Sequence, residues 1–268
     1  MRILVTNDDG IAAPGLAVAE AIAAEVAGAD GEVWVAAPAF EQSGVSHAIS
    51  FTSPVKVEQL APRRFACAGT PADCVILAMH SFLKDTPPDL VISGVNRGHN
   101  IAEDAVYSGT VGGAIEGALQ GVRAVALSQY FGRPASSSQQ DDTERAPDLF
   151  DAARSEGAEA VRRALATPWK RDLFFNINFP PVAAQDVKGY RFAQQGRRQS
   201  GSFGAEGRVS PAGRDYFWIR HRVDNLSGDP EDDCVLCAQG WVTLVPMLPS
   251  YTDHETLVAA NAAAETVS

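Results

Sequence analysis

The stretch that decides the fold is residues 2–10, which read RILVTNDDG. Residues 3–5 form a short apolar run typical of a fully buried parallel strand, and the polar, turn-forming residues 7–10 end that run abruptly. The predicted strand therefore carries two carboxylates, Asp8 and Asp9, at its carboxyl end. Ligands of open α/β sheets lie beyond the carboxyl ends of the strands, so both acids are candidate site residues.

Neighbouring side chains on an extended strand point to opposite faces of the sheet. Asp8 and Asp9 can therefore reach one ion only if the backbone turns after the strand, and Gly10 makes such a turn easy. A purely structural alternative is that both acids cap the following loop and helix.

The next segments predict a strand, helix, strand unit and hence a parallel sheet. Apolar residues recur at helical spacing over residues 16–26, and residues 32–38, EVWVAAP, form a second buried strand. The loop at 39–47 leaves the carboxyl end of that strand. Ser43 and Gly44 are thereby expected to approach the same crevice as the two acids.

Residues 89–100, DLVISGVNRGHN, form the second informative stretch. Residues 90–92 predict a buried strand, and the glycines and asparagines after it predict a loop for close approach to a ligand. The Ser-Gly-Thr at 108–110 then predicts a helix start that can bind an anion. Thr110 acting as an ordinary N-cap is the structural alternative.

Composition narrows the class of protein. The chain has 268 residues, 46% apolar content and a formal net charge of −11. A net negative charge argues against binding of nucleic acid polymers or anionic membrane surfaces. The sequence shows neither a basic leader nor an apolar run near the roughly 20 residues of a membrane span. We therefore expect a cytoplasmic α/β protein.

Four cysteines, Cys67, Cys74, Cys234 and Cys237, fit a reducing compartment. The last two form a CxxC motif. A zinc site needs a second pair of ligands, and a thioredoxin-like site needs the motif at a helix start after an early strand, so core packing is the expectation.

The remaining chain predicts fewer site residues. Thr70 is expected to cap a helix that starts at Pro71, and Thr252 a terminal helix over residues 252–267. Residues 136–143, SSSQQDDT, predict a mobile polar loop, and residues 149–165 an amphipathic helix. Core strands are expected at 173–178 and 241–247, with a long β excursion for oligomer contacts over 191–219.

Five motifs together resemble the stationary-phase survival protein SurE family of metal-dependent nucleotidases. They are NDDG at 7–10, SG at 43–44, GTPADCV at 69–75, SGVNRGHN at 93–100 and YSGT at 107–110. The resemblance implies a Rossmann-like α/β fold with a mostly parallel sheet and flanking helices, and a C-terminal part for homodimer or homotetramer assembly. We accordingly expect a catalytic core at 1–183 and an oligomerisation part at 184–268.

The resemblance also implies a divalent metal held by Asp8, Asp9, Ser43 and Asn96, with Mg²⁺ or Mn²⁺ favoured by the all-oxygen ligands. The activity it implies is hydrolysis of nucleoside 5′- and 3′-monophosphates, sometimes also of short polyphosphate. One departure is visible: Ala39 stands where the family usually has Asp.

The expected mechanism is direct hydrolysis by metal-activated water, with Asp8 or Asp9 orienting or deprotonating that water. The residues expected to hold the phosphate are Asn96, Gly98, His99, Asn100, Ser108, Gly109 and Thr110. Two alternatives from other classes are a silent nucleotide-binding protein and an assembly protein with a structural Ca²⁺. The first alternative requires a glycine fingerprint, which this sequence lacks. The second would favour more carboxylates than the four-ligand set provides.

Overall fold

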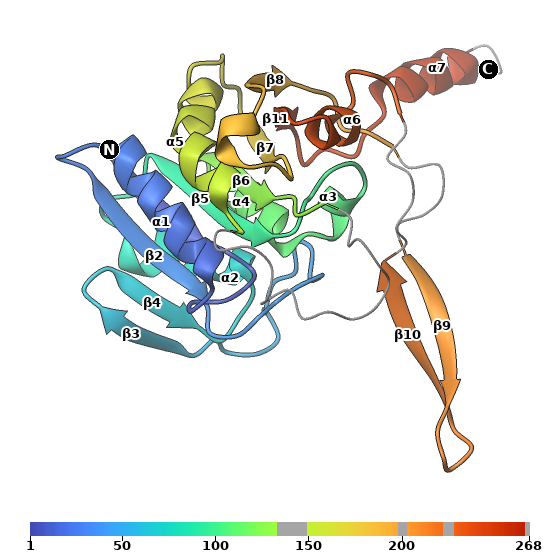
Figure 1. The fold of residues 1–268 in the computed structure, drawn as a ribbon, viewed down its shortest axis with the longest axis horizontal. Helices are drawn as coiled ribbons and strands as arrows, with labels where there is room; N and C mark the ends of the chain where they lie inside the picture. Colours follow the sequence, from blue (N-terminus) through green and yellow to red (C-terminus); the bar gives the residue numbers. More distant parts are fainter. Residues whose placement is uncertain (133–148, 198–202, 222–227, 266–268) are drawn as a thin grey trace.

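A computed structural model describes residues 1–132, 149–197, 203–221 and 228–265 of the chain (Figure 1). The loop expected at 136–143 lies outside these residues. The strands are β1 (Arg2–Thr6), β2 (Glu32–Pro38), β3 (Val57–Ala61), β4 (Arg64–Cys67), β5 (Leu90–Arg97), β6 (Arg123–Gln129), β7 (Phe174–Phe179), β8 (Tyr190–Phe192), β9 (Phe203–Val209), β10 (Asp215–His221) and β11 (Val242–Met247). The helices are α1 (Pro14–Ala27), α2 (Pro71–Leu77), α3 (Asp104–Tyr107), α4 (Gly109–Leu119), α5 (Asp151–Leu165), α6 (Asp233–Ala238) and α7 (His254–Glu265), with a π-helical turn η1 (Ala78–Phe82) and a 3-10 turn η3 (Ala184–Asp186).

Nine of these strands form one sheet in the order β3-β4-β2-β1-β5-β6-β7-β11-β8. Strands β4, β2, β1, β5, β6 and β7 run parallel, whereas β3 and β11 each pair antiparallel to a neighbour. The chain passes from β1 to β2 on one side and later places β5 on the other side. The strand order therefore reverses between β1 and β5, which is where doubly wound sheets bind ligands.

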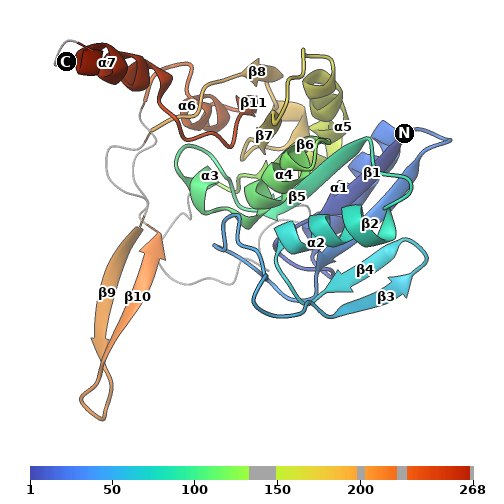
Figure 2. The same cartoon turned by 180° about the vertical axis from the view of Figure 1, so that it is seen from behind.

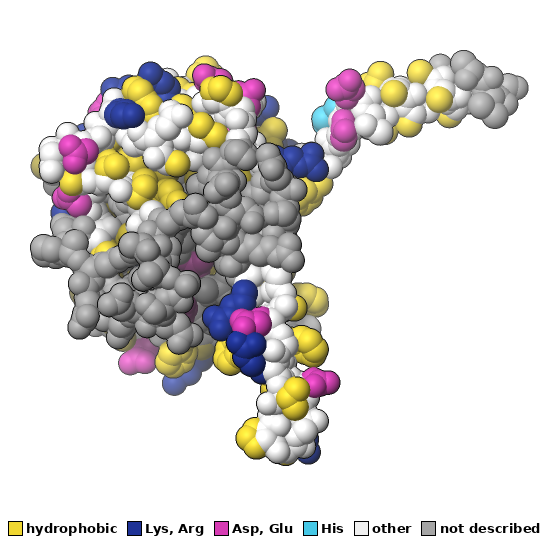
Figure 3. Space-filling model, turned by 45° about the vertical axis from the view of Figure 1, so that its right-hand side comes forward, with side chains coloured by type: hydrophobic (Ala, Val, Ile, Leu, Met, Phe, Trp, Pro, Cys, Tyr) yellow, Lys and Arg dark blue, Asp and Glu magenta, His cyan; other side chains and the backbone are white. Residues whose placement is uncertain are grey.

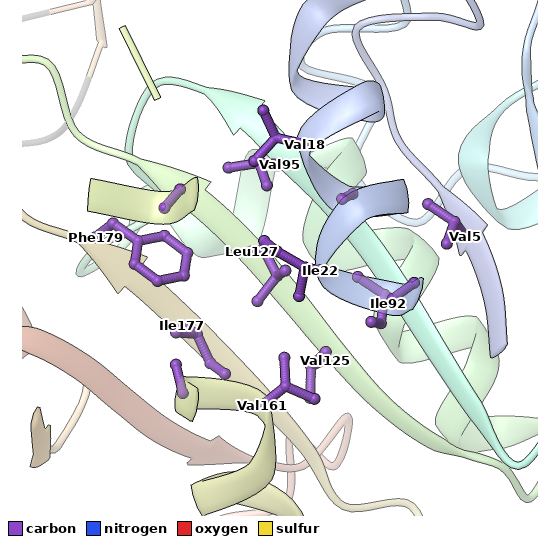
Figure 4. Packing of buried hydrophobic residues seen from close by; sticks show 14 of the residues in the cluster. Val5, Val18, Ile22, Ile92, Val95, Val125, Leu127, Val161, Ile177 and Phe179 are labelled. Carbon is purple, nitrogen blue, oxygen red and sulfur yellow. The ribbon is translucent and has the colours of Figure 1, made fainter. Parts of the chain in front are cut away.

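Side chains of β1 alternate between two apolar layers, as the two-residue period of a strand requires. Ile3 and Val5 pack with α1 and α5 on one face, and Leu4 packs with α2 and α4 on the other. Figures 1 and 2 show these helix pairs on opposite faces of the sheet, and Figure 4 shows Ile22 and Val161 lying over the strands. The predicted α/β fold with a mostly parallel sheet and flanking helices is confirmed.

The predicted bounds of β2 and the predicted start of α2 were confirmed, because residues close together in the sequence determine both. Strand β2 has the predicted bounds, and α2 begins after Thr70, whose hydroxyl accepts a hydrogen bond from the Asp73 amide at 3.2 Å. Asp73 in turn accepts from the Thr70 amide at 2.9 Å, which completes a capping box. The expected strand at 90–92 was too short, because β5 resumes pairing with β6 after a bulge and continues to Arg97.

The C-terminal part contains both sheet strands and projecting elements. Strands β8 and β11 belong to the main sheet, while β9 and β10 form a separate antiparallel hairpin. Figure 3 shows this hairpin and α7 standing out from the body with hydrophobic side chains on their surfaces. The terminal helix starts at His254, so the predicted Thr252 cap was wrong. Asp253 caps instead, because its carboxylate accepts from the Thr256 amide at 3.1 Å.

Helix α6 carries the CxxC motif and was not expected from the sequence. Cys234 and Cys237 are buried free thiols that pack against Ile101 and Ala102, and burial raises the pKa of Cys234 to about 11. This packing agrees with the expected role of these cysteines in the core. Among the described residues, no helix combines the length and the apolar character needed to cross a membrane.

Candidate functional site

The chain turns sharply after β1, as the sequence requires for the two acids to converge. Asn7 holds the turn: its side-chain amide donates to the Gly10 carbonyl at 2.9 Å, and its carbonyl oxygen accepts from the Gly10 amide at 3.3 Å. Gly10 has φ +102°, which a side chain would disfavour. Helix α1 has Ala13 as N-cap with no side-chain cap bond. The alternative in which Asp8 and Asp9 cap that helix is therefore wrong.

Both acids line a pocket of about 320 Å³ between the carboxyl ends of β1 and β5. The lining residues are Asp8, Asp9, Ser43, Gly44, Asn96, Arg97, Gly98, His99, Asn100, Asp104, Tyr107, Ser108 and Phe203. Of the residues expected from the sequence, all but Gly109 and Thr110 appear in this lining. Those two lie directly behind Asp8 instead, as their contacts show.

Asp8 is almost fully buried, with 4% of its surface exposed. Its Oδ1 accepts a hydrogen bond from the Thr110 hydroxyl at an oxygen–oxygen distance of 2.5 Å. A side chain at Gly109 would place its Cβ only 2.9 Å from the Asp8 Cβ. Burial raises the pKa of Asp8 to about 6, and the Thr110 bond partly opposes that rise because it stabilises the ionised carboxylate.

Asp9 is half-buried beside Asp8, and burial likewise raises its pKa. The backbone amide of Arg97 donates to its Oδ2 at 2.9 Å, which opposes the rise. The two carboxylates also repel one another, and this repulsion is a further reason for the high pKa of Asp8. An acidic pair in this state is stabilised by a cation bound between its members.

Ser43 and Asn96 complete an all-oxygen group at the pocket. The Ser43 hydroxyl donates to Glu41 at 2.7 Å, which leaves its oxygen lone pairs for another partner. The Asn96 side chain uses its nitrogen to donate to the Gly98 carbonyl at 3.0 Å, so its oxygen is the atom available to a ligand. Two carboxylates, a hydroxyl and an amide oxygen fit a hard divalent cation such as Mg²⁺ or Mn²⁺.

The N-cap of α4 is not Thr110, which was the structural alternative for that residue. Ser108 is the N-cap, and its hydroxyl accepts from the Val111 amide at 3.1 Å. Thr110 is fully buried and gives its hydroxyl to Asp8 instead. The interpretation of Thr110 as the cap was wrong because the cap position falls two residues earlier.

His99 and Asn100 are held by the surrounding protein. His99 Nδ1 lies 3.3 Å from Asp104, and its ring meets Tyr130 edge-on at a centroid distance of 4.7 Å. Asn100 donates from its side chain to Ser128 at 2.7 Å and from its backbone amide to Asn178 at 2.8 Å. These contacts hold His99 and Asn100 in position without a ligand, which is the preorganisation that binding sites require.

Four pocket residues were given no role in the sequence analysis: Arg97, Asp104, Tyr107 and Phe203. Arg97, inside the quoted SGVNRGHN stretch, is the one Lys or Arg among the described residues of the lining. Tyr107 belongs to the quoted YSGT motif, in which only the Ser-Gly-Thr was given a role. Phe203 comes from β9, which is distant in sequence, so no local signal pointed to it.

The strand reversal and the acidic pocket together define a doubly wound α/β protein with a polar ligand site at the switch point between β1 and β5. The family model described as "Survival protein SurE" matches residues 3–202. The chain therefore belongs to the SurE family, as the sequence motifs predicted.

Relatives and a solved structure support this assignment over nearly the whole chain. A protein named 5′-nucleotidase SurE from Ruegeria sp. (strain TM1040) is 54% identical over 98% of this chain and 99% of its own length. A relative of the same name from Cereibacter sphaeroides (strain KD131 / KCTC 12085) is 50% identical over the same shares. The crystal structure of the SurE protein from Aquifex aeolicus superposes with a TM-score of 0.78 at 29% identity, covering 97% of this chain and 98% of that one.

Proposed function

We propose that the protein is a divalent-metal-dependent phosphomonoesterase that hydrolyses nucleoside 5′- and 3′-monophosphates to nucleoside and phosphate. The observation that carries the proposal is the joint placement of Asp8, Asp9, Ser43 and Asn96 in one pocket beyond β1 and β5. The name 5′-nucleotidase given to relatives about 50% identical supports the substrate class. Hydrolysis of 3′-monophosphates and of short polyphosphate extends the proposal beyond that name.

The proposed metal ligands are the same four side chains, each already held by a protein bond that leaves an oxygen for the ion. Mg²⁺ or Mn²⁺ held by these residues would supply Lewis-acid polarisation of the phosphoryl group and would lower the pKa of a water molecule. Asp8 or Asp9 would orient that water and accept its proton.

The proposed phosphate contacts lie on the β5 side of the pocket and at the start of α4. Arg97 can offer its guanidinium fork to phosphate oxygens, and the glycine at 98 leaves its backbone open to close approach. Asn96, His99, Asn100 and Ser108 are the further proposed contacts. Gly109 and Thr110, which the sequence also suggested, lie behind Asp8 and outside the lining, so their proposed part is to position that carboxylate. Together the phosphate contacts would stabilise the charge that develops on the phosphoryl oxygens.

Phosphate release from metal-stripped protein tests this function. We would incubate the protein with 5′- and 3′-nucleoside monophosphates and add Mg²⁺, Mn²⁺ or chelator. We expect release only with metal, and loss of both metal binding and release in Asp8→Asn. Asp30→Asn is the matched control, because Asp30 is exposed before the amino end of β2. Full turnover by Asp8→Asn, or no release from folded wild-type protein with either metal, would overturn the proposal.

We also propose that the protein works in the cytoplasm as a homodimer or homotetramer. The division into a core at 1–183 and an assembly part at 184–268 is retained in this proposal. Its support is the projecting hairpin, on which Phe217, Trp218 and Ile219 are each at least 60% exposed. Apolar side chains at that exposure are typical of surfaces that a second subunit covers.

A further inference from the structure

The pocket has one apolar wall, made by two aromatic rings from separate parts of the chain. Tyr107 ends α3, and Phe203 begins β9 on the projecting hairpin. Their ring centroids lie 4.9 Å apart with an interplanar angle of 78°, so the edge of one ring meets the face of the other. Tyr107 is 46% exposed and Phe203 40% exposed, so much of each side chain remains accessible to solvent.

All other side chains in the described lining are polar or charged, apart from the glycines. The pocket therefore has a polar region, with carboxylates, amides and a guanidinium, and an apolar region made by the two aromatic rings. A ligand that satisfies both parts needs an anionic group joined to a flat, weakly polar group. A nucleoside monophosphate has this form, because its base can stack on an aromatic side chain while its phosphate reaches the polar groups.

Hydrogen bonds connect the segment that carries Tyr107 to the loop of the proposed metal site. The Tyr107 carbonyl accepts from the Ser46 amide at 3.1 Å, and the Ser46 hydroxyl donates to the Val106 carbonyl at 2.7 Å. These bonds tie the end of α3 to the loop that carries Ser43. Thr110, whose hydroxyl donates a hydrogen bond to Asp8, follows only three positions after Tyr107.

We infer that Tyr107 and Phe203 form the nucleobase-binding wall of the pocket. The hairpin is thereby assigned a part in substrate binding in addition to its proposed part in assembly. The inference rests on the proposed function, since it names the residues that stack on the base of the nucleoside monophosphate. Stacking accepts both purines and pyrimidines, because each has an aromatic face.

The test compares two substrates that differ in the base alone. 5′-AMP and ribose 5-phosphate carry the phosphate on the same ribose carbon, and ribose 5-phosphate has no base. We expect Tyr107→Leu and Phe203→Leu each to lower kcat/KM for 5′-AMP by about 5- to 150-fold, the range produced by losing one base–aromatic stack. Turnover of ribose 5-phosphate should change by less than about twofold.

Phe51→Leu is the matched control, because it makes the same kind of substitution away from both the pocket and the hairpin. Phe51 is 84% exposed and is absent from the pocket lining. We expect this variant to turn over both substrates as wild type does. Light scattering would check that the assembly state of every variant equals that of wild type. An equal loss for 5′-AMP and ribose 5-phosphate, or no loss for either, in the Tyr107 and Phe203 variants would overturn the inference.

Binding of adenosine by equilibrium dialysis separates this inference from the proposed function. Adenosine carries the base without the phosphate, so its binding requires no hydrolysis. Binding to wild type that weakens in Tyr107→Leu and Phe203→Leu, and persists in Phe51→Leu, supports the wall even if no phosphate is released. Equal binding to all four proteins, or none to wild type, refutes the wall even if 5′-AMP is hydrolysed.

Discussion

Replacing Thr110 by Val removes the hydroxyl that holds Asp8 and keeps nearly the same side-chain volume. The lost contact is a 2.5 Å hydrogen bond to a buried carboxylate. Hydrogen bonds to charged groups contribute about 1.5–3 kcal/mol, and 1.36 kcal/mol corresponds to one pH unit of pKa. The pKa of Asp8, about 6 in the metal-free protein, should therefore rise by about one to two pH units in Thr110→Val.

The sign of the stability effect follows from this rise. The folded pKa of Asp8 lies above the ordinary value of 3.8, so the folded protein keeps its proton after the unfolded chain has lost it. The free energy of unfolding then falls as the pH rises between those two pKa values. In wild type this fall ends near pH 6, whereas in Thr110→Val it continues for about one to two further pH units.

Urea unfolding in chelator at pH 5 and pH 9 measures this difference. Thr110→Ser is the matched control because it keeps the hydroxyl and loses only a methyl group. Between pH 5 and pH 9, Thr110→Val should lose about 1.5–3 kcal/mol more stability than Thr110→Ser. Mn²⁺ binding by Thr110→Val should also be weaker near pH 6.5 and recover by pH 9. A stability difference between the two variants that is the same at both pH values would refute the reasoning.

Two further predictions concern buried positions, Gly109 behind Asp8 and Asp233 on α6. Gly109→Ala should lower kcat/KM for phosphate release at least about tenfold. The added Cβ would lie 2.9 Å from the Asp8 Cβ and 3.1 Å from the Gln42 carbonyl oxygen, so Asp8 must move. Wild-type turnover in this variant would contradict the prediction. Burial raises the pKa of Asp233 from 3.8 to about 6, so this group should cost about 3 kcal/mol of stability as the pH rises from 4 to 6. Urea unfolding of Asp233→Asn across that range should show a correspondingly smaller decline, and an unchanged decline would exclude this origin.

The sequence predicted those features that depend on residues close together in the chain. The apolar run at 3–5 and the acids after it predicted β1 and the placement of Asp8 and Asp9 at its carboxyl end. Thr70 and Asp73 belong to one capping box, so the start of α2 could be recognised locally. The end of β5 could not, since pairing with β6 beyond the bulge extends the strand through residues typical of loops.

The sequence by itself determined the parallel sheet and the kinds of side chain that its strand ends present, because strand periodicity and turn residues act over a few neighbouring positions. Only the tertiary structure decided that Thr110 holds Asp8 across 102 positions of sequence and that Phe203 reaches Tyr107 from the hairpin. Such contacts depend on how separate elements pack, and no local pattern in the chain specifies which distant side chain will fill a given space.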